Sequence, residues 1–336
     1  MRILALLHAY PPHHNAGAEW MTHTLLRAVV ERGHDVDVVL SNTAPGGPYE
    51  RDGVRVYPFR SKGDPFEFVE DADAIVTHLE CTQRASMIGQ MRGVPVAHLL
   101  HNTFGQTRNW LRKGPCHLAV YNSQWMRADF EAWLDSVCAP RPPGVVVRPP
   151  VLASEYATIP GDRVTLINLY RPKGSAVFWR LAERMTDVTF LAVTGGYGDQ
   201  DIRRLPNVLV LPNIPGDQMR DQVYARTKIL LMPSEYESWG RAGVEAMCSG
   251  IPVIAHPTPG LRESLGDAGI FVDRDDLDGW EKTIRRLLSP RAYGAASRKA
   301  KARAAELDPA PDLARWCDAV EALAGLRGRL RALARL

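Results

Sequence analysis

Two glutamates flank a polar turn that follows an apolar run in the second half of the chain. Residues 228–245 read KILLMPSEYESWGRAGVE. A strand, a turn at Gly240 and a helix beginning near Arg241 would direct unpaired backbone N–H groups and the positive end of a helix dipole toward an anion. The sequence therefore predicts an anion site that suits a diphosphate, with Glu237 before the helix and Glu245 about one turn inside it.

The two carboxylates at this turn allow two interpretations. One carboxylate can face a sugar while the other accepts hydrogen bonds from vicinal hydroxyls, which is how acidic side chains hold a ribose. The spacing of Glu237 and Glu245 is equally consistent with two solvated acids, because acidic residues favour helix N-termini in any protein. The spacing alone leaves both interpretations open.

A second polar loop, NLYRPKG, occupies residues 168–174 and follows the first apolar run of the second half. Lys173 lies next to a glycine in this loop, where a lysine is well placed to neutralise a phosphate. A solvated loop lysine is the alternative. We expect Lys173 to be the phosphate-binding cation.

Apolar runs alternate with amphipathic stretches along the chain, which is typical of parallel sheets covered by helices. Strands are predicted over residues 3–8, 36–40, 54–58, 74–78, 96–100, 119–122 and 145–148, and again over 164–168, 189–194, 208–211, 228–232, 253–255 and 270–272. Helices are predicted over residues 18–32, 81–92 and 123–134. The fold class is therefore α/β, with two Rossmann-like parallel sheets.

The chain divides near a proline-rich segment, residues 139–150, where regular structure is disfavoured. A length of 336 residues also exceeds what one hydrophobic core usually holds. We predict an N-terminal domain over residues 1–155, a C-terminal domain over 156–310, and C-terminal helices over 311–336 that cross back to the first domain. Two such sheets facing a cleft would bind ligands at the carboxyl ends of their strands.

The segment from Glu237 to Glu245 resembles the signature of the retaining glycosyltransferases of family 4, which have the GT-B fold. The preceding apolar strand, the Pro-Ser pair, the turn at Gly240 and the continuation EAMCSGIPVIA all match. The resemblance implies that Glu245 binds the ribose hydroxyls and that Glu237 lies beside the donor hexose and phosphates. It also implies backbone contacts to the sugar or diphosphate from Ser238, Trp239 and Gly240.

The loop that carries Lys173 departs from this family at one position. The family usually has an arginine five residues before the lysine, where this chain has Asn168. Arg171 would then supply the charge from a different position, or the site would work with one cation fewer. Further nucleotide contacts are expected after neighbouring strands, at positions that are also consistent with simple turns. They are Gly195, Asn213 and Ile214.

The first half contributes a glycine loop and a histidine to the resemblance. Residues 11–19 read PPHHNAGAE, with Ala16-Gly17 where the family has Gly-Gly, which implies donor-phosphate and acceptor contacts at Gly17. Candidates for acceptor binding, or simply exposed loop side chains, are His13, His14 and Glu19. His101 follows a predicted strand and resembles the family's histidine beside the donor hexose, although a histidine buried beneath a loop is the alternative. His78 lacks such a context and is interpreted as structural.

The resemblance implies transfer of a hexosyl unit from a nucleotide-diphosphate sugar, with retention at the anomeric carbon and with His101, Glu237 and Lys173 as catalytic candidates. UDP is favoured as the commonest carrier, and the acceptor is expected to be a small molecule or a glycan. No Asp-x-Asp pair or histidine cluster is spaced like a metal site, so we expect a metal-independent reaction without a cofactor. A nucleotide-sugar epimerase or phosphorylase on the same fold and a non-catalytic nucleotide-sugar binder are the alternatives.

Composition limits the partners. A net charge of +3 with scattered lysines and arginines argues against nucleic acid. Five cysteines without a CxxC pair predict neither disulfides nor zinc, which fits the cytoplasm. We find no export signal and no apolar run of about 18 residues.

Residues 313–336 have the pattern of a basic amphipathic helix, which would pack on the first domain or contact an anionic membrane. Its apolar face and surrounding charges would comprise Leu326, Leu330 and Leu333 with Arg327, Arg329, Arg331 and Arg335.

Overall fold

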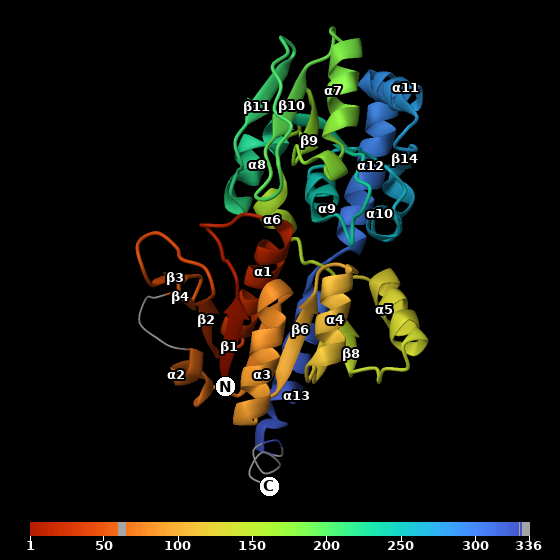
Figure 1. Cartoon of the computed structure of the whole chain (residues 1–336). Helices are drawn as coiled ribbons and strands as arrows, with labels where there is room; N and C mark the ends of the chain where they lie inside the picture. Colours follow the sequence, from red (N-terminus) through yellow and green to blue (C-terminus); the bar gives the residue numbers. More distant parts are fainter. Residues whose placement is uncertain (60–64, 329, 331–336) are drawn as a thin grey trace. The chain divides into compact units, whose positions relative to one another are not determined.

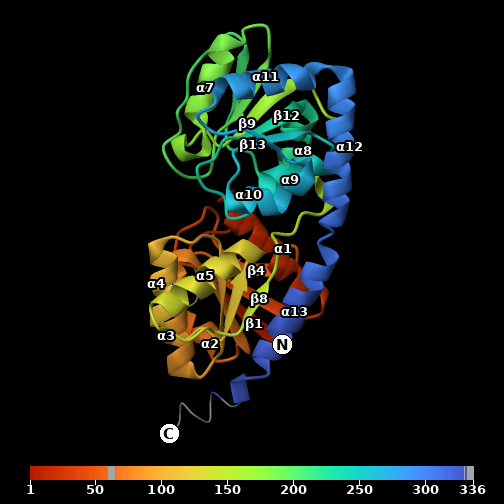
Figure 2. The same ribbon diagram turned by 90° about the vertical axis from the view of Figure 1, so that its right-hand side faces the viewer.

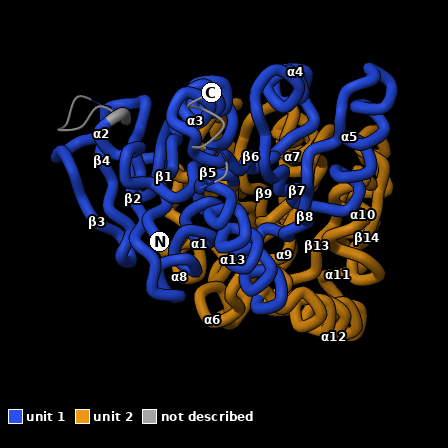
Figure 3. Tube along the Cα trace, turned by 90° about the horizontal axis from the view of Figure 1, so that it is seen from below, with its two compact units in different colours: residues 1–14, 18–150, 310–336 blue, residues 15–17, 151–309 orange. Residues whose placement is uncertain are grey.

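The computed structural model describes residues 1–59, 65–328 and 330, and these divide into two units. Unit 1 comprises Met1–His14, Ala18–Pro150 and Ala310–Leu336, and unit 2 comprises Asn15–Gly17 and Val151–Pro309 (Figure 3). Each unit is built on its own sheet, as the two series of predicted strands require.

The sheet of unit 1 has eight strands in the order β3-β4-β2-β1-β5-β6-β7-β8. Figure 1 labels β1, β2, β3, β4, β6 and β8 of this sheet. They are β1 (Arg2–Leu7), β2 (Asp35–Leu40), β3 (Tyr49–Arg51), β4 (Val54–Tyr57), β5 (Ala74–His78), β6 (Val96–Leu100), β7 (Leu118–Tyr121) and β8 (Gly144–Val146). Neighbouring strands pair in parallel except β3, which runs antiparallel to β4 at the edge. The sequence analysis missed β3 because its three partly exposed residues form no apolar run.

Helices cover both faces of this sheet. They are α1 (Gly17–Glu31), α2 (Pro65–Val69), α3 (Thr82–Arg92), α4 (Gly105–Lys113), α5 (Gln124–Ser136) and α13 (Ala310–Ala324). Successive side chains of β1 point to opposite faces, so Ile3 joins the core that contains residues of α1 and α13, while Leu4 joins the core that contains residues of α3. A strand buried on both faces reads as a continuous apolar run, which is why β1 was predicted.

Unit 2 has a six-stranded parallel sheet in the order β11-β10-β9-β12-β13-β14. Its strands are β9 (Arg163–Ile167), β10 (Phe190–Val193), β11 (Val208–Leu211), β12 (Thr227–Met232), β13 (Val253–Ala255) and β14 (Ile270–Phe271). Its helices are α6 (Ala153–Tyr156), α7 (Ser175–Arg184), α8 (Met219–Gln222), α9 (Arg241–Cys248), α10 (Pro259–Leu265), α11 (Leu277–Leu288) and α12 (Pro290–Glu306). One core includes residues of β12 and α9, and a second includes residues of β9, α7 and α11.

The helix α13 belongs to unit 1 although it comes from the end of the chain. It lies against β5, β6 and β8, and Figure 2 shows α13 beside β8. The Trp316 indole is fully buried, and its Nε1 donates a hydrogen bond to the Leu25 carbonyl at 2.9 Å. The Arg148 Nε contacts the buried Asp312 carboxylate at 2.6 Å. Unit 1 is therefore assembled from both ends of the sequence.

Beyond α13, Leu326 packs against the core of unit 1, and Arg327 donates to Asp73 Oδ1 at 3.1 Å. The predicted positions Arg329, Arg331, Leu333 and Arg335 lie outside the described residues. No helix in the described part of the chain is long and apolar enough to cross a membrane. All five cysteines are free thiols.

Candidate functional site

The loops after β9 and β12 form the centre of the candidate site in unit 2. These strands are neighbours in the sheet, and β10 lies on the other side of β9. The chain therefore leaves β9 and β12 toward opposite sides, and the crevice at such a switch point is where open α/β sheets bind ligands. Lys173 ends the short helical turn after β9, and Glu237 lies in the loop after β12.

Lys173 and Glu237 are in direct contact. The Lys173 Nζ donates to Glu237 Oε1 at 2.6 Å, and the Ser234 hydroxyl donates to the same oxygen at 2.9 Å. Burial disfavours the charged lysine, but the Glu237 carboxylate and the Tyr197 hydroxyl outweigh it and raise the pKa of Lys173 above its ordinary value. The lysine is therefore cationic at neutral pH, and a carboxylate holds it at the strand end.

Arg274 ties the two loops together, and the sequence analysis missed it. One terminal nitrogen donates to the Pro172 carbonyl at 3.0 Å and to the Pro233 carbonyl at 2.7 Å. The other donates to the Arg171 carbonyl at 2.9 Å and lies 3.0 Å from Glu235 Oε1. The Arg274 side chain is only 15% exposed. Because it follows the two-residue strand β14, no motif marks it, and only the fold brings it to these loops.

Glu245 is buried in α9 and already has two partners. Its Oε1 lies 3.0 Å from Arg241 Nε, and its Oε2 accepts a hydrogen bond from the Tyr224 hydroxyl at 2.6 Å. Arg241 also donates to the Tyr156 hydroxyl at 2.9 Å. Burial, followed by the Glu245 charge, raises the pKa of Tyr224 well above its ordinary value, so this hydroxyl remains a donor. A carboxylate offers about four acceptor positions, which leaves acceptor capacity for a ligand.

Asn168, at the position of the family's arginine, shapes the turn after β9. Its φ is +76°, in the left-handed region. Its Oδ1 accepts hydrogen bonds from the Tyr170 N–H at 3.0 Å and from Gln200 Nε2 at 3.1 Å. A Cβ on Gly195 would overlap the Asn168 side chain, which explains the glycine there. Arg171 is exposed, and its carbonyl, which Arg274 binds, is its contribution to the loop.

Three further predicted donor residues have mainly structural contacts. The Trp239 and Ile214 side chains lie in the core of unit 2, so a ligand could meet only their backbone. The Asn213 Nδ2 donates to the Thr194 carbonyl at 3.4 Å. Gly240 precedes α9 with a φ of +84°, as a left-handed N-cap requires, and Ser238 is partly buried beside it.

Unit 1 has a histidine cluster at the switch point of its own sheet, where β1 lies between β2 and β5. His8 follows β1, His78 ends β5 and His101 follows β6. His78 Nδ1 lies 2.9 Å from His101 Nε2, and the His8 and His78 rings have centroids 5.2 Å apart. Burial lowers the pKa of His101 to about 4, so it is neutral at physiological pH. His78, interpreted as structural from sequence, therefore belongs to the cluster.

Glu19 joins this cluster and is not an exposed loop side chain, since it is only 2% exposed. Its Oε1 lies 3.1 Å from His8 Nε2 and 3.9 Å from His14 Nε2. Burial opposes charge on both His8 and Glu19, yet their hydrogen bond raises the pKa of His8 and lowers that of Glu19. By contrast, His13 is exposed and packs edge-on against Tyr49.

The structure brings together three residues whose side chains could hold a metal ion. His8, His14 and Glu19 have ligand atoms within 4.8 Å of one another. The three residues come from a strand end, a loop and the first turn of α1, so no local spacing marked them. Gly17 begins α1, and a Cβ there would meet open space.

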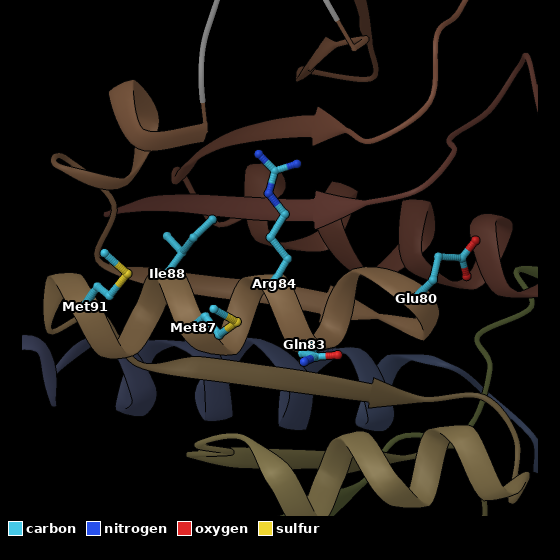
Figure 4. A pocket seen from close by; sticks show the side chains of 6 residues that line it. All are labelled: Glu80, Gln83, Arg84, Met87, Ile88 and Met91. Atoms are coloured by element: carbon cyan, nitrogen blue, oxygen red, sulfur yellow. The ribbon is translucent and has the colours of Figure 1, made fainter.

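Unit 1 also has a hollow on α3 (Figure 4). It is lined by Glu80, Gln83, Arg84, Met87, Ile88 and Met91. Glu80, at the N-terminal end of this row, is 3.8 Å from His8 Nδ1. The other lining residues are Met87, Ile88 and Met91, which are apolar, with Gln83 and Arg84.

A sequence comparison relates part of the chain to a known family. The model described as glycosyl transferases group 1 matches residues 165–290, which contain Lys173, Glu237, Glu245 and Arg274. This part of the chain is similar to the group 1 glycosyltransferases. Among curated relatives, the D-inositol 3-phosphate glycosyltransferase of Mycolicibacterium smegmatis is 32% identical over 177 residues, or 52% of this chain and 36% of the relative. The O-antigen chain mannosyltransferase B of Escherichia coli is 30% identical over 113 residues, or 34% of this chain and 25% of the relative.

The alignments thus span about a quarter to a third of these curated relatives. Solved structures match over nearly the full chain. Sucrose-phosphate synthase from Thermosynechococcus elongatus has a TM-score of 0.72 at 18% identity and covers 99% of both chains. The Anabaena protein HepE in complex with UDP-glucose has a TM-score of 0.74 at 18% identity and covers 96% of this chain and all of that one. This likeness confirms the predicted fold, GT-B with two Rossmann-like domains.

Proposed function

We propose that the chain transfers a hexosyl unit from a nucleotide-diphosphate sugar, with UDP as the carrier, to a small-molecule or glycan acceptor with retention at the anomeric carbon. The observation that carries the proposal is the Lys173–Glu237 pair at the switch point of unit 2. The group 1 family match over the same residues supports it, and HepE, which has the same fold, was solved with UDP-glucose.

In this proposal, each residue of the Lys173–Glu237 pair stabilises one of the two charges that develop in the transition state. Breaking the bond between the anomeric carbon and the diphosphate builds negative charge on the phosphate and positive charge on the sugar ring. In our proposal Lys173 and the N-terminus of α9 stabilise the phosphate, and Glu237 stabilises the sugar. The reaction then needs no metal at the diphosphate, and the departing phosphate assists deprotonation of the acceptor hydroxyl.

Glu245 is proposed to hold the ribose. Arg241 and Tyr224 fix its carboxylate from one side, and the acceptor positions left on its oxygens are suited to the two ribose hydroxyls. Gly195 and Asn213, at the ends of neighbouring strands, are proposed to line the nucleotide. In unit 1, neutral His101 is proposed to hydrogen-bond a sugar hydroxyl.

The test measures nucleotide binding by calorimetry and thermal melting with UDP, GDP, ADP, dTDP and NAD. Lys173→Ala removes a charge-assisted hydrogen bond worth about 1.5–3 kcal/mol, or roughly 10- to 150-fold in Kd. The exposed Lys282→Ala is the control. Lys173 is preferred to Glu245 as the target because removing Glu245 would leave the buried Arg241 charge unpaired.

We expect one nucleoside diphosphate to raise the Tm of the wild type and of Lys282→Ala, and to bind Lys173→Ala at least tenfold more weakly. Stabilisation by NAD alone, or equal binding to both variants, would contradict the proposal. The loss of the family arginine at Asn168 favours a second candidate, a non-catalytic nucleotide-sugar binder. That candidate predicts tight binding with no release of nucleoside diphosphate from the sugar nucleotide.

A further inference from the structure

We propose that unit 1 binds a divalent transition-metal ion, with zinc as the best match, between His8, His14 and Glu19. This inference is independent of the donor chemistry proposed for unit 2. Two imidazoles and one carboxylate form a ligand set that suits zinc and related metals, whereas magnesium and calcium prefer oxygen ligands.

The distances within the cluster fit a common centre. Zinc binds histidine nitrogens and carboxylate oxygens at about 2.0–2.2 Å, so two such ligands of a tetrahedral ion lie roughly 3.3–3.6 Å apart. Glu19 Oε1 lies 3.1 Å from His8 Nε2 and 3.9 Å from His14 Nε2, which brackets this separation. Small side-chain rotations would bring all three atoms to one ion.

Two buried polar atoms of the cluster lack a hydrogen-bond partner. A metal ion would account for the Glu19 oxygen, whose burial without a partner costs more free energy than that of the histidine nitrogen. Glu19 Oε2 and His8 Nδ1 are both buried without a partner. An unsatisfied buried carboxylate oxygen is rare and calls for an unseen ion or water. An ion bound by both oxygens of Glu19 would satisfy Oε2 and neutralise this carboxylate, which is 2% exposed. His8 Nδ1 would face Glu80, 3.8 Å away, in the manner of the outer carboxylates that orient metal-bound imidazoles.

A simple ion pair between His8 and Glu19, without a metal, explains fewer of these observations than a metal ion does. Such a pair leaves Glu19 Oε2 unsatisfied and gives no reason for His14 to approach the same carboxylate. The His14 side chain is 31% exposed, so one side of the cluster is open. Three protein ligands and one open position are the pattern of zinc sites that bind water or a substrate oxygen. The metal would therefore present an oxygen-binding position at the strand ends of unit 1.

The test uses the untagged full chain after chelator treatment, with Zn²⁺ followed by calorimetry and Co²⁺ followed by its visible absorption. We expect about one ion per chain and a rise in Tm with Zn²⁺. His14→Ala should weaken Zn²⁺ binding at least 100-fold, and it is a mild change because this side chain is partly exposed. His13→Ala is the matched control, since the neighbouring exposed ring packs on Tyr49 and lies outside the ligand set.

Circular dichroism checks that both variants are folded. Glu19→Gln, which keeps the shape and removes the charge, should alter the Co²⁺ spectrum. Less than stoichiometric binding to the wild type, or equal binding to His14→Ala and His13→Ala, would overturn the proposal. Nucleotide binding to unit 2 is measured separately, so failure of the metal site and failure of the donor site remain distinguishable.

Discussion

Asn168 meets two separate structural requirements, a left-handed backbone conformation and a side-chain amide that accepts hydrogen bonds. A φ of +76° favours glycine or asparagine, and the amide oxygen accepts two hydrogen bonds. The turn that presents Lys173 therefore depends on a side chain that an arginine could not replace in the same pose. Asn168 therefore stabilises the turn but does not carry the positive charge of the arginine that the resembled family usually has at this position.

The two requirements can be separated by a pair of variants. Asn168→Gly loses the amide and also the Cβ that is strained in the left-handed region. Asn168→Ala loses the amide but keeps the Cβ, whose strain of about 1–2 kcal/mol is then no longer offset by the amide hydrogen bonds. We expect both to lower the free energy of unfolding in urea, and Ala to be about 1 kcal/mol less stable than Gly. Equal stability of the two variants would show that the turn relaxes out of the left-handed region.

At the scale of elements, Arg274 connects the loops after β9 and β12 through three carbonyls and Glu235. A guanidinium presents several donors in a fixed plane, and a lysine presents a single point charge. We predict that Arg274→Lys weakens binding of the nucleoside diphosphate about tenfold and that Arg274→Ala weakens it further, because Lys173 and Glu237 lose their common support. Calorimetry on the folded variants measures this.

Arg285→Ala provides the comparison for this prediction. Arg285 also pairs with carboxylates, those of Asp187 and Glu281, but it lies on the exposed face of α11. Surface pairs contribute at most about 1 kcal/mol, so donor binding should be unchanged. If Arg274→Ala lowers stability but leaves the Kd of the nucleotide unaltered, Arg274 is a packing residue and not a positioning one.

Among the secondary-structure elements, the sequence analysis predicted the strands that have uninterrupted apolar runs. The strands β9 and β12, which precede the loops of Lys173 and Glu237, were predicted because they are largely buried apolar runs. The strand β3 was missed because it has no apolar run, and α4 because its residues, Gly105–Lys113, are mostly polar. Arg274 could not be assigned, because its partners are distant in the chain and only the order of the strands brings them together.

At the scale of the whole molecule, buried histidines are confined to one unit. Of the ten histidines, only His256 belongs to unit 2. Burial lowers the pKa of His98 to about 3 and that of His23 to about 4. In the unfolded chain each histidine titrates near 6.5, so below this pH the unfolded state binds more protons than the folded state. Unit 1 should therefore lose stability as the pH falls from 6.5 toward 4.

The expected loss at pH 5 is about 2 kcal/mol for a histidine such as His98. Hydrogen exchange is measured at pH 7 and pH 5 and corrected for intrinsic rates. Between these two pH values, the amide protection of β5, β6 and β7 should fall more than that of β9 and β10. His98→Gln, which can keep the contact of Nε2 with the Ser86 hydroxyl at 2.9 Å, should reduce the pH dependence. Equal acid sensitivity of both units would contradict this prediction.

The return of α13 to unit 1 also sets an order for folding during synthesis. Domains usually fold as they leave the ribosome, with the N-terminal one first. Here unit 1 lacks the Trp316 part of its core until α13 is translated, whereas unit 2 is continuous apart from three residues and is complete once Pro309 has emerged. Unit 2 can therefore reach its native state while unit 1, most of which is synthesised earlier, still lacks α13.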